Sequence, residues 1–323
     1  MPRTRFYRDG QLVDEGFPIR EVSDRLAVDG ALVWFDLCSP TKEELATVRE
    51  ELGLHSLAIE GALTEQQRPK LVHYENHRLL AAYAVTFDVD NAEVASHQVV
   101  AFLTSNALVT VRRDDAFDID EVVRRWDDQP DLARFGVAFL LHGLLDYVVD
   151  THMDAALALD QELEKLEDRL FDEGDTQRAV QRRTFELRKS LLVLRRVVLP
   201  MREVVNAVLR HHGAGDRTGL YPFYQDVYDH MLRAVEWTDS LRDFVATILD
   251  TQLTLRGNRL NVVMKQVTSW AAIIAVPTAV TGFYGMNVPY PGYGETIGFW
   301  ASVVVVLATS AALYAIFKRK NWL

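Results

Sequence analysis

The stretch "QVTSWAAIIAVPTAVTGFYGMNVPYPGYGETIGFWASVVVVLATSAALYAIF", residues 266–317, decides the fold because it holds a single charged residue, Glu295. Residues 266–283 and 297–317 are 18 and 21 residues long and carry no charge. At about 1.5 Å per residue, each can cross the roughly 30 Å hydrocarbon core of a bilayer. A helix buried in a soluble core is the alternative, but such helices rarely exclude charge over this length. The sequence therefore predicts two transmembrane helices.

Basic residues flank the pair of spans at its two outer ends, and none lies in the loop between the spans. They precede the first span and follow the second, as Arg256, Arg259, Lys265, Lys318, Arg319 and Lys320. Because basic residues favour the cytoplasmic side, both flanks are expected inside and the short loop outside. The prediction is a multi-pass protein of the cell membrane with its N- and C-termini in the cytoplasm.

The rest of the chain is acidic. The 323 residues carry a net charge of −11, and only one of the 46 acidic residues lies after position 254, which leaves 29 basic and 45 acidic residues before position 255. Such a body repels nucleic acid, whose phosphates need clustered Lys and Arg, and attracts cations. An ordinary solvated surface is the alternative reading. No nucleic-acid partner is expected.

The first part of the chain has the alternation of strand and helix patterns that is typical of an α/β domain. Asp9-Gly10 lies between apolar residues and predicts a hairpin turn. Ser39 or Thr41 can cap a helix that has acids in its first turn. Strands are expected at residues 31–37, 79–87, 97–103 and 107–111.

Beyond residue 130 the pattern is helical. Helices are expected over 135–170 and 176–212, followed by a glycine-rich break at 211–219. The pattern from residue 222 to Tyr284 predicts a helix of roughly 95 Å, so only its end can lie in a bilayer. The predicted parts are an α/β cytoplasmic domain (1–130), a helical cytoplasmic hairpin (131–221), a stalk helix continuing into the first span (222–284), an external loop (285–296), the second span (297–317) and a basic tail (318–323).

Several short stretches of the sequence resemble those of a known family. The motif "YGMN" at Tyr284–Asn287, between two C-terminal spans and before "KRKNWL", is similar to that of the CorA magnesium transporters. The resemblance covers nearly the whole chain, since further characteristic stretches are "WFDLCSPTKEEL" (34–45), "LAIEGALTEQQRPKL" (57–71), "KLEDRLF" (165–171) and "FYQDVYDH" (223–230).

The resemblance implies a funnel-shaped homopentamer whose first spans line one pore. It implies that Gly285, Met286 and Asn287 form the selectivity filter and that Mg²⁺ is both substrate and regulatory ligand, with Co²⁺ or Ni²⁺ as further ions. A zinc-transporting branch usually has a different middle residue in the triplet, which favours magnesium. Two features depart from the family: Glu295 is the one acid of the loop, and Ala275 stands where a bulkier pore residue is common.

The chemistry of Asn287 agrees with this role. Mg²⁺ prefers oxygen ligands and gives up water reluctantly. A ring of amide oxygens can accept hydrogen bonds from a hydrated ion without trapping it as carboxylates would, and conduction needs binding weak enough to release the ion. Gly285 lets the backbone approach the pore axis. A simple hairpin between two spans is the alternative.

Helical spacing places a set of residues on one face of the first span. Their small and hydroxyl side chains suit a water-filled pore, and they equally suit tight helix packing. Met264 and Val267 could form an apolar gate that closes by dewetting, and Pro277 is expected to kink the span. The predicted pore-lining residues are Asn261, Met264, Val267, Thr268, Ala271, Ala275, Thr278 and Gly282.

By resemblance, Asp88 and Asp226 match a pair of acids that senses divalent cations at the subunit interface. Carboxylates brought together across subunits repel unless a cation bridges them, so bound Mg²⁺ would stabilise a closed state. Asp250 on the stalk is a further candidate. A solvated loop acid is the alternative for Asp88.

Other functions fit less well. The chain could carry Zn²⁺, Co²⁺ or Ni²⁺, or it could be a membrane-anchored sensor or scaffold whose spans are only an anchor. No phosphate-binding glycine loop is present, so no nucleotide is expected. Cys38 has no evident base partner, so no enzyme is predicted. The expected partners are copies of the chain itself and the lipid bilayer.

Overall fold

The computed structural model describes residues 3–63, 67–170, 177–213, 219–287, 289 and 291–323. The chain divides into two compact units, Met1–Ala246 and Thr247–Leu323. The strands of the first unit are β1 (Arg3–Arg8), β2 (Gln11–Glu15), β3 (Ala31–Cys38), β4 (Lys70–His73), β5 (Arg78–Asp88), β6 (Glu93–Leu103) and β7 (Ala107–Arg112). The helices are η1 (Ile19–Glu21), α1 (Val22–Leu26), α2 (Lys42–Leu52), α3 (Ser56–Leu63), α4 (Ile119–Asp128), η2 (Pro130–Phe135), α5 (Val137–Leu170), α6 (Gln177–Gly213), α7 (Tyr221–Tyr284) and α8 (Thr296–Arg319).

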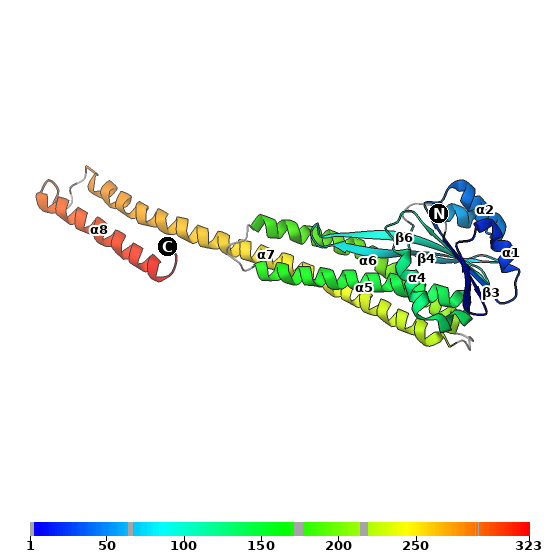
Figure 1. Cartoon of the computed structure of the whole chain (residues 1–323). Coiled ribbons are helices and arrows are strands. Elements are labelled where there is room, and N and C mark those ends of the chain that lie inside the picture. The colour runs from blue at the N-terminus through cyan, green and yellow to red at the C-terminus, as the bar shows by residue number, and fades with distance from the viewer. Residues whose placement is uncertain (1–2, 64–66, 171–176, 214–218, 288, 290) are drawn as a thin grey trace. The chain divides into compact units, whose positions relative to one another are not determined.

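The strands form one mixed sheet (Figure 1) in the order β2-β1-β3-β7-β6-β5-β4. Only β3 and β7 pair in parallel, and the other neighbours are antiparallel. Strand β7 is buried along its whole length, as expected for a strand covered on both faces. The four predicted strands and the α/β class are confirmed, whereas β4 and α3 were not predicted.

Two local predictions are also confirmed. Asp9 and Gly10 both have positive φ, 50° and 79°, which is the backbone of the tight turns that join β-hairpins. Thr41 caps α2: its hydroxyl accepts a hydrogen bond from the backbone N–H of Glu44, and the Glu44 carboxylate accepts one from the backbone N–H of Thr41. This reciprocal arrangement satisfies two backbone donors at the start of the helix.

Helices cover both faces of the sheet. On one face, α2 and α3 bury an apolar cluster that includes Leu45 and Phe102. On the other, Trp126 of α4 packs edge-on against Trp34 of β3, with ring centroids 4.9 Å apart. Figure 1 shows α1 and α2 on the opposite side of the sheet from α4 and α5. The core therefore lies in two layers, one on each side of the strands.

The long helices α5 and α6 belong to the same compact unit as the sheet. Helix α5 packs against β5, and α6 packs against β6. The first part of α7 joins them: the Tyr224 hydroxyl donates a hydrogen bond to the Ala138 carbonyl at 2.6 Å, and Arg195 pairs with Asp239 at 3.1 Å. The segments predicted as 1–130 and 131–221 thus share one packed body.

The second unit contains the rest of α7 and the whole of α8. Helix α7 is a single helix of 64 residues that includes Pro277, and it contains the whole of the range 222–284 in which the sequence predicts a continuous helix. Both helices are long and apolar enough to cross a membrane, and almost none of their apolar windows is buried. The predicted spans 266–283 and 297–317 lie within these helices.

Candidate functional site

The candidate filter begins where α7 ends. The backbone N–H of Gly285 donates to the Thr281 carbonyl at 2.9 Å, and that of Met286 donates to the Phe283 carbonyl at 3.2 Å. These bonds close the last turn of the helix. Met286 is 49% exposed, and Asn287 is also exposed. The Asn287 amide is therefore presented one turn beyond the end of α7, uncovered by its own chain.

The loop that follows is held against the start of α8. Gly292 and Gly294 have φ values of 88° and 82°, a backbone region that favours glycine. The N–H of Glu295 donates to the Gly292 carbonyl at 3.1 Å, and the N–H of Gly298 donates to the Glu295 carbonyl at 3.2 Å. Glu295 is the residue before α8, and its carboxylate forms no capping hydrogen bond. Its charge is therefore available to the loop rather than used by the helix.

Gly298 is a site residue that the sequence did not reveal. It is buried in the first turn of α8, and an added Cβ would collide with the carbonyl group of Gly292. A Cβ on Gly292 would in turn lie 3.1 Å from the Gly298 Cα atom. The loop can therefore lie on α8 only because both positions are glycine. Positions 288 and 290 of the predicted loop lie outside the described residues.

The predicted pore face lies on a part of α7 that is largely exposed within the single chain, as are Trp270 and Ile274 outside that face. Ser269, on the other side of the helix, is buried, and Ile273 and Val280 are partly covered. By contrast, every predicted pore residue is exposed within the single chain: Asn261, Met264, Val267, Thr268, Ala271, Ala275, Thr278 and Gly282. This face therefore has no covering from its own chain and is available to water or to other copies.

Hydroxyl groups near Pro277 are bonded to their own helix. The Thr278 hydroxyl donates to the Ile274 carbonyl at 3.0 Å, and the Thr281 hydroxyl donates to the Pro277 carbonyl at 2.9 Å. These are the i to i−4 hydroxyl bonds that threonine commonly makes to its own helix backbone. The oxygen atoms of both threonines keep lone pairs that can accept hydrogen bonds from water.

Asp88 lies at the exposed end of β5. Its carboxylate accepts hydrogen bonds from the Asn91 side-chain amide at 2.7 Å and from the backbone N–H groups of Asp90 and Asn91 at 2.9 and 3.2 Å. These bonds, that from the Asn91 side chain first, lower the pKa of Asp88 below its ordinary value. The carboxylate is thus held ionised and oriented, as a cation ligand must be.

Asp226 lies on the exposed side of α7, near two side chains that the sequence analysis did not identify, His230 and Asp150. Its carboxylate is 3.8 Å from His230 Nε2, and His230 Nδ1 is 3.6 Å from the Asp150 carboxylate of α5. Arg125 pairs with Asp150 and with Asp146, at 2.8 and 2.5 Å. The helical spacing of Asp146, Asp150 and Asp154 on α5 was the available sequence signal.

The three predicted regulatory acids lie in two different units of the chain. Across the described ranges, no three His, Cys, Asp or Glu side chains are grouped so that they could hold a metal ion. Asp250 is exposed on α7 in the second unit, whereas Asp88 and Asp226 belong to the first.

Comparisons with known proteins identify relatives of this chain. Residues 29–319 match the family described as CorA-like Mg2+ transporter protein. The cobalt/magnesium transport protein CorA of Thermotoga maritima is 30% identical over 280 residues, which cover 85% of this chain and 79% of that protein. The zinc transport protein ZntB of Yersinia pseudotuberculosis is 24% identical over 297 residues, 90% of this chain and 88% of that protein.

The fold has a close counterpart among solved structures. The complete structure of the CorA magnesium transporter from Methanocaldococcus jannaschii superposes with a TM-score of 0.78 at 24% identity, covering all of this chain and 99% of that one. The likeness extends over the α/β unit, the long helices and the two C-terminal helices. The α/β unit, the long helices and the two C-terminal helices predicted from the sequence are therefore found together in a solved structure.

Proposed function

This chain belongs to the CorA-like Mg²⁺ transporter family, and we propose that it is a channel that carries hydrated Mg²⁺ into the cell, with Asn287 in the filter. The observation that carries the proposal is the position of Asn287. Its side chain is exposed, one turn beyond the end of α7. The exposed residues from Thr268 to Gly282 precede it along the same helix. In an assembly of several copies, the Asn287 amides would form a ring at the entrance of the pore that α7 lines, so every entering ion would pass them.

The proposed assembly is a funnel-shaped homopentamer in which α7 lines the axis. The exposed α7 face supports this, because side chains that no part of the chain covers are placed for a shared pore. The two helices of each copy would cross the cell membrane with both termini in the cytoplasm, since the basic flanks favour that side. The loop at Gly285–Asn287 then faces outside.

Selectivity would come from hydrogen bonding rather than from charge. Mg²⁺ holds its water shell tightly, so a filter that binds the hydrated ion avoids the cost of dehydration. Amide oxygens of Asn287 can accept hydrogen bonds from that shell, whereas carboxylates would bind more strongly and slow release. Glu295, uncommitted as a helix cap, would raise the local cation concentration near the mouth.

The membrane potential supplies the driving force. A divalent ion that enters a cell at 150 mV, negative inside, gains roughly 7 kcal/mol. No nucleotide is needed for uptake of this kind. Met264 and Val267, both more than 60% exposed on the face of α7, would form the apolar gate, which closes when water leaves it.

Regulation is assigned to the acids of the cytoplasmic part. Asp88 is ionised and oriented by Asn91, and Asp226 is exposed. Each would need a carboxylate from a neighbouring copy to hold Mg²⁺. Binding at such an interface would stabilise a symmetric closed state, and loss of the ion would release it. Asp250 would add a second site of the same kind.

The test is Mg²⁺ uptake into liposomes that contain the full-length protein under an inside-negative potential. We expect uptake by the wild type and its loss in Asn287→Ala. Asn321→Ala, which changes the same residue type in the C-terminal tail, serves as the matched control and should leave uptake intact. Equal uptake by wild type and Asn287→Ala would remove Asn287 from the conduction path and favour a two-span anchor for a sensor or scaffold.

A second candidate function is transport of Zn²⁺, Co²⁺ or Ni²⁺. It is favoured by the match to ZntB over 90% of the chain. Competition in the same assay separates the two: for a magnesium channel, excess Mg²⁺ suppresses uptake of a trace of labelled Co²⁺ or Ni²⁺. Zinc uptake that is insensitive to Mg²⁺ would instead identify a zinc transporter.

A further inference from the structure

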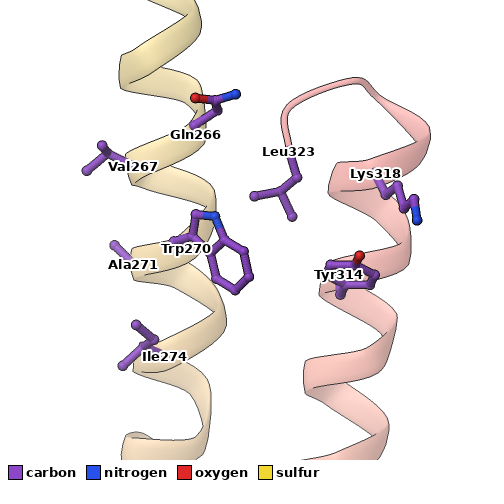
Figure 2. A pocket seen from close by; sticks show the side chains of 8 residues that line it. All are labelled: Gln266, Val267, Trp270, Ala271, Ile274, Tyr314, Lys318 and Leu323. Atoms are coloured by element: carbon purple, nitrogen blue, oxygen red, sulfur yellow. The ribbon is translucent and has the colours of Figure 1, made fainter.

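A groove lies between α7 and α8 near the C-terminal end of α8. Its cavity volume is about 740 Å³, and polar groups of both helices line it: Gln266, Trp270, Tyr314 and Lys318. Figure 2 shows Trp270 and Leu323 in the space between the two helices, with Gln266 one turn along α7 from Trp270. Both helices belong to the second unit, so the groove is formed within one compact part of the chain.

The C-terminal tail forms the end of the groove. The backbone N–H of Trp322 donates to the Phe317 carbonyl at 2.9 Å, and the two rings stack with centroids 5.7 Å apart. Lys320 lies over the Trp322 ring, 5.9 Å from its centroid. This fold of the tail turns Leu323 back to the groove and keeps the Lys320 side chain on the tail.

Lys318 is the one cationic side chain among the groove-lining residues. Its ammonium group lies 5.6 Å from the centroid of the Tyr314 ring, a distance at which an aromatic face attracts a cation. Among the described residues it pairs with no carboxylate. The ammonium group is thus held at the groove by the Tyr314 ring rather than by an ion pair among the described residues.

The wall of the groove beyond these polar groups is apolar and uncovered. Ile274 is 64% exposed and Trp270 is 52% exposed. Tryptophan, tyrosine and lysine at the end of a span are the residues that lie at the level of lipid headgroups. A charged end and an apolar wall in one groove match the two ends of a phospholipid.

We infer that this groove binds an anionic phospholipid of the cytoplasmic leaflet. Lys318 holds the phosphate, Gln266 and Tyr314 donate hydrogen bonds to the headgroup, and an acyl chain lies along the wall at Ile274. Basic pockets between membrane helices on the cytoplasmic side are suited to such headgroups. A phospholipid of this class matches both the Lys318 charge and the apolar wall.

The inference rests on the proposed function for the position of the two helices in the membrane, and the groove borders the proposed pore face, because Val267 and Ala271 also line it. It does not depend on which ion is carried. The test is native mass spectrometry of the full-length assembly released from nanodiscs that contain equal amounts of phosphatidylglycerol and phosphatidylcholine. We expect the wild type to retain phosphatidylglycerol preferentially. Because the readout involves no ion uptake, its failure is distinct from failure of the transport proposal.

Charge variants locate the site. Lys318→Gln should lower phosphatidylglycerol retention roughly fivefold, the change expected for one cationic contact to an anionic lipid, and Lys318→Arg should keep it. Lys320→Gln removes the same charge two residues away and should behave as the wild type. An equal loss in Lys318→Gln and Lys320→Gln would overturn the inference, because it would indicate general attraction to the basic tail.

A second variant keeps the test decisive if Lys318→Gln does not assemble. Ile274→Trp narrows the groove without altering charge and should also lower retention of phosphatidylglycerol. Retention unchanged in Ile274→Trp would overturn the assignment of the acyl chain to this wall. A wild type that carries no phosphatidylglycerol would overturn the whole inference and would indicate that another copy covers the groove.

Discussion

Gly298 in the first turn of α8 lies directly against Gly292 of the preceding loop, and neither position has room for a side chain. The contact joins the segment that follows α7 to the first turn of α8, so that segment is packed against the helix at its far end. Asn287 and this pair of glycines therefore belong to one connection between α7 and α8.

The first prediction concerns this contact. Gly298→Ala inserts a Cβ into the Gly292 carbonyl and must push the loop away from α8, at the 1 to 3 kcal/mol typical of an overpacked contact. We expect Mg²⁺ uptake to fall roughly tenfold in the liposome assay. Gly61→Ala is the matched control, since its Cβ would meet Leu79 at an ordinary 3.6 Å, and it should leave uptake unchanged. Normal uptake by Gly298→Ala would show that the loop position does not matter for conduction.

The second prediction concerns the buried ion pair of the sheet. Arg112 donates to Asp36 from Nε at 3.1 Å and from Nη2 at 2.7 Å, and both side chains are at most 5% exposed. Removing one partner of such a pair leaves an uncompensated buried charge and costs about 3 to 5 kcal/mol. Asp36→Ala should therefore lower the thermal unfolding midpoint of the detergent-solubilised protein by about 10 °C.

The control for that experiment is an exposed ion pair. Arg182 pairs with Glu186 at 2.8 Å, and the Arg182 side chain is 83% exposed. Because solvent screens such pairs, Arg182→Ala should change stability by less than about 1 kcal/mol. Equal midpoints for Asp36→Ala and Arg182→Ala would contradict the assigned role of the buried pair.

The features that could be predicted from the sequence are those set by neighbours in the chain. The Thr41–Glu44 capping box and the Asp9-Gly10 turn depend on residues one to three positions apart. Uninterrupted apolar composition identifies the two helices that are long enough to cross a membrane. In each case local geometry determines the outcome, so no knowledge of distant contacts was needed.

The features that could not be predicted depend on contacts between distant segments. The parallel pairing of β3 with β7 joins strands about 70 residues apart, as in Val33 opposite Ala107, and nothing in either strand specifies the partner. Asp226 could be picked out from the resemblance, but its neighbour Asp150 comes from another helix. The Gly298 contact likewise exists only once the loop has folded onto α8.

The third prediction concerns the pH dependence of stability. His152 of α5 is fully buried, its Nε2 atom donates to the Tyr83 carbonyl at 2.7 Å, and burial lowers its pKa to about 4. The unfolded chain, with an ordinary histidine pKa near 6.5, therefore binds more protons than the folded one between about pH 4 and 6.5. Stability must fall as the pH drops through that window, by about 2 kcal/mol between pH 7 and pH 5 from this residue alone.

Thermal unfolding measured at pH 7 and pH 5 tests the assignment. His152→Gln keeps a side-chain donor for the Tyr83 carbonyl but cannot be protonated, so the loss of stability at pH 5 should be smaller in this variant than in the wild type. His55→Gln, which changes a partly stacked surface histidine beside Tyr74, should keep the wild-type dependence. A pH response in His152→Gln identical to that of the wild type would assign the effect to other groups.

The last prediction concerns the regulatory acids. If Asp226 binds Mg²⁺ across a subunit interface, Asp226→Ala removes a ligand that exists only in the closed state, and the internal Mg²⁺ concentration needed to halve uptake should rise roughly fivefold or more. The measurement is initial uptake into liposomes loaded with a series of internal Mg²⁺ concentrations. Asp229→Ala, which removes another exposed carboxylate three residues further along α7, is the matched control and should leave the midpoint in place. A common shift in both variants would indicate that net negative charge, rather than a ligand at position 226, sets the response, because a specific site responds only to loss of its own carboxylate.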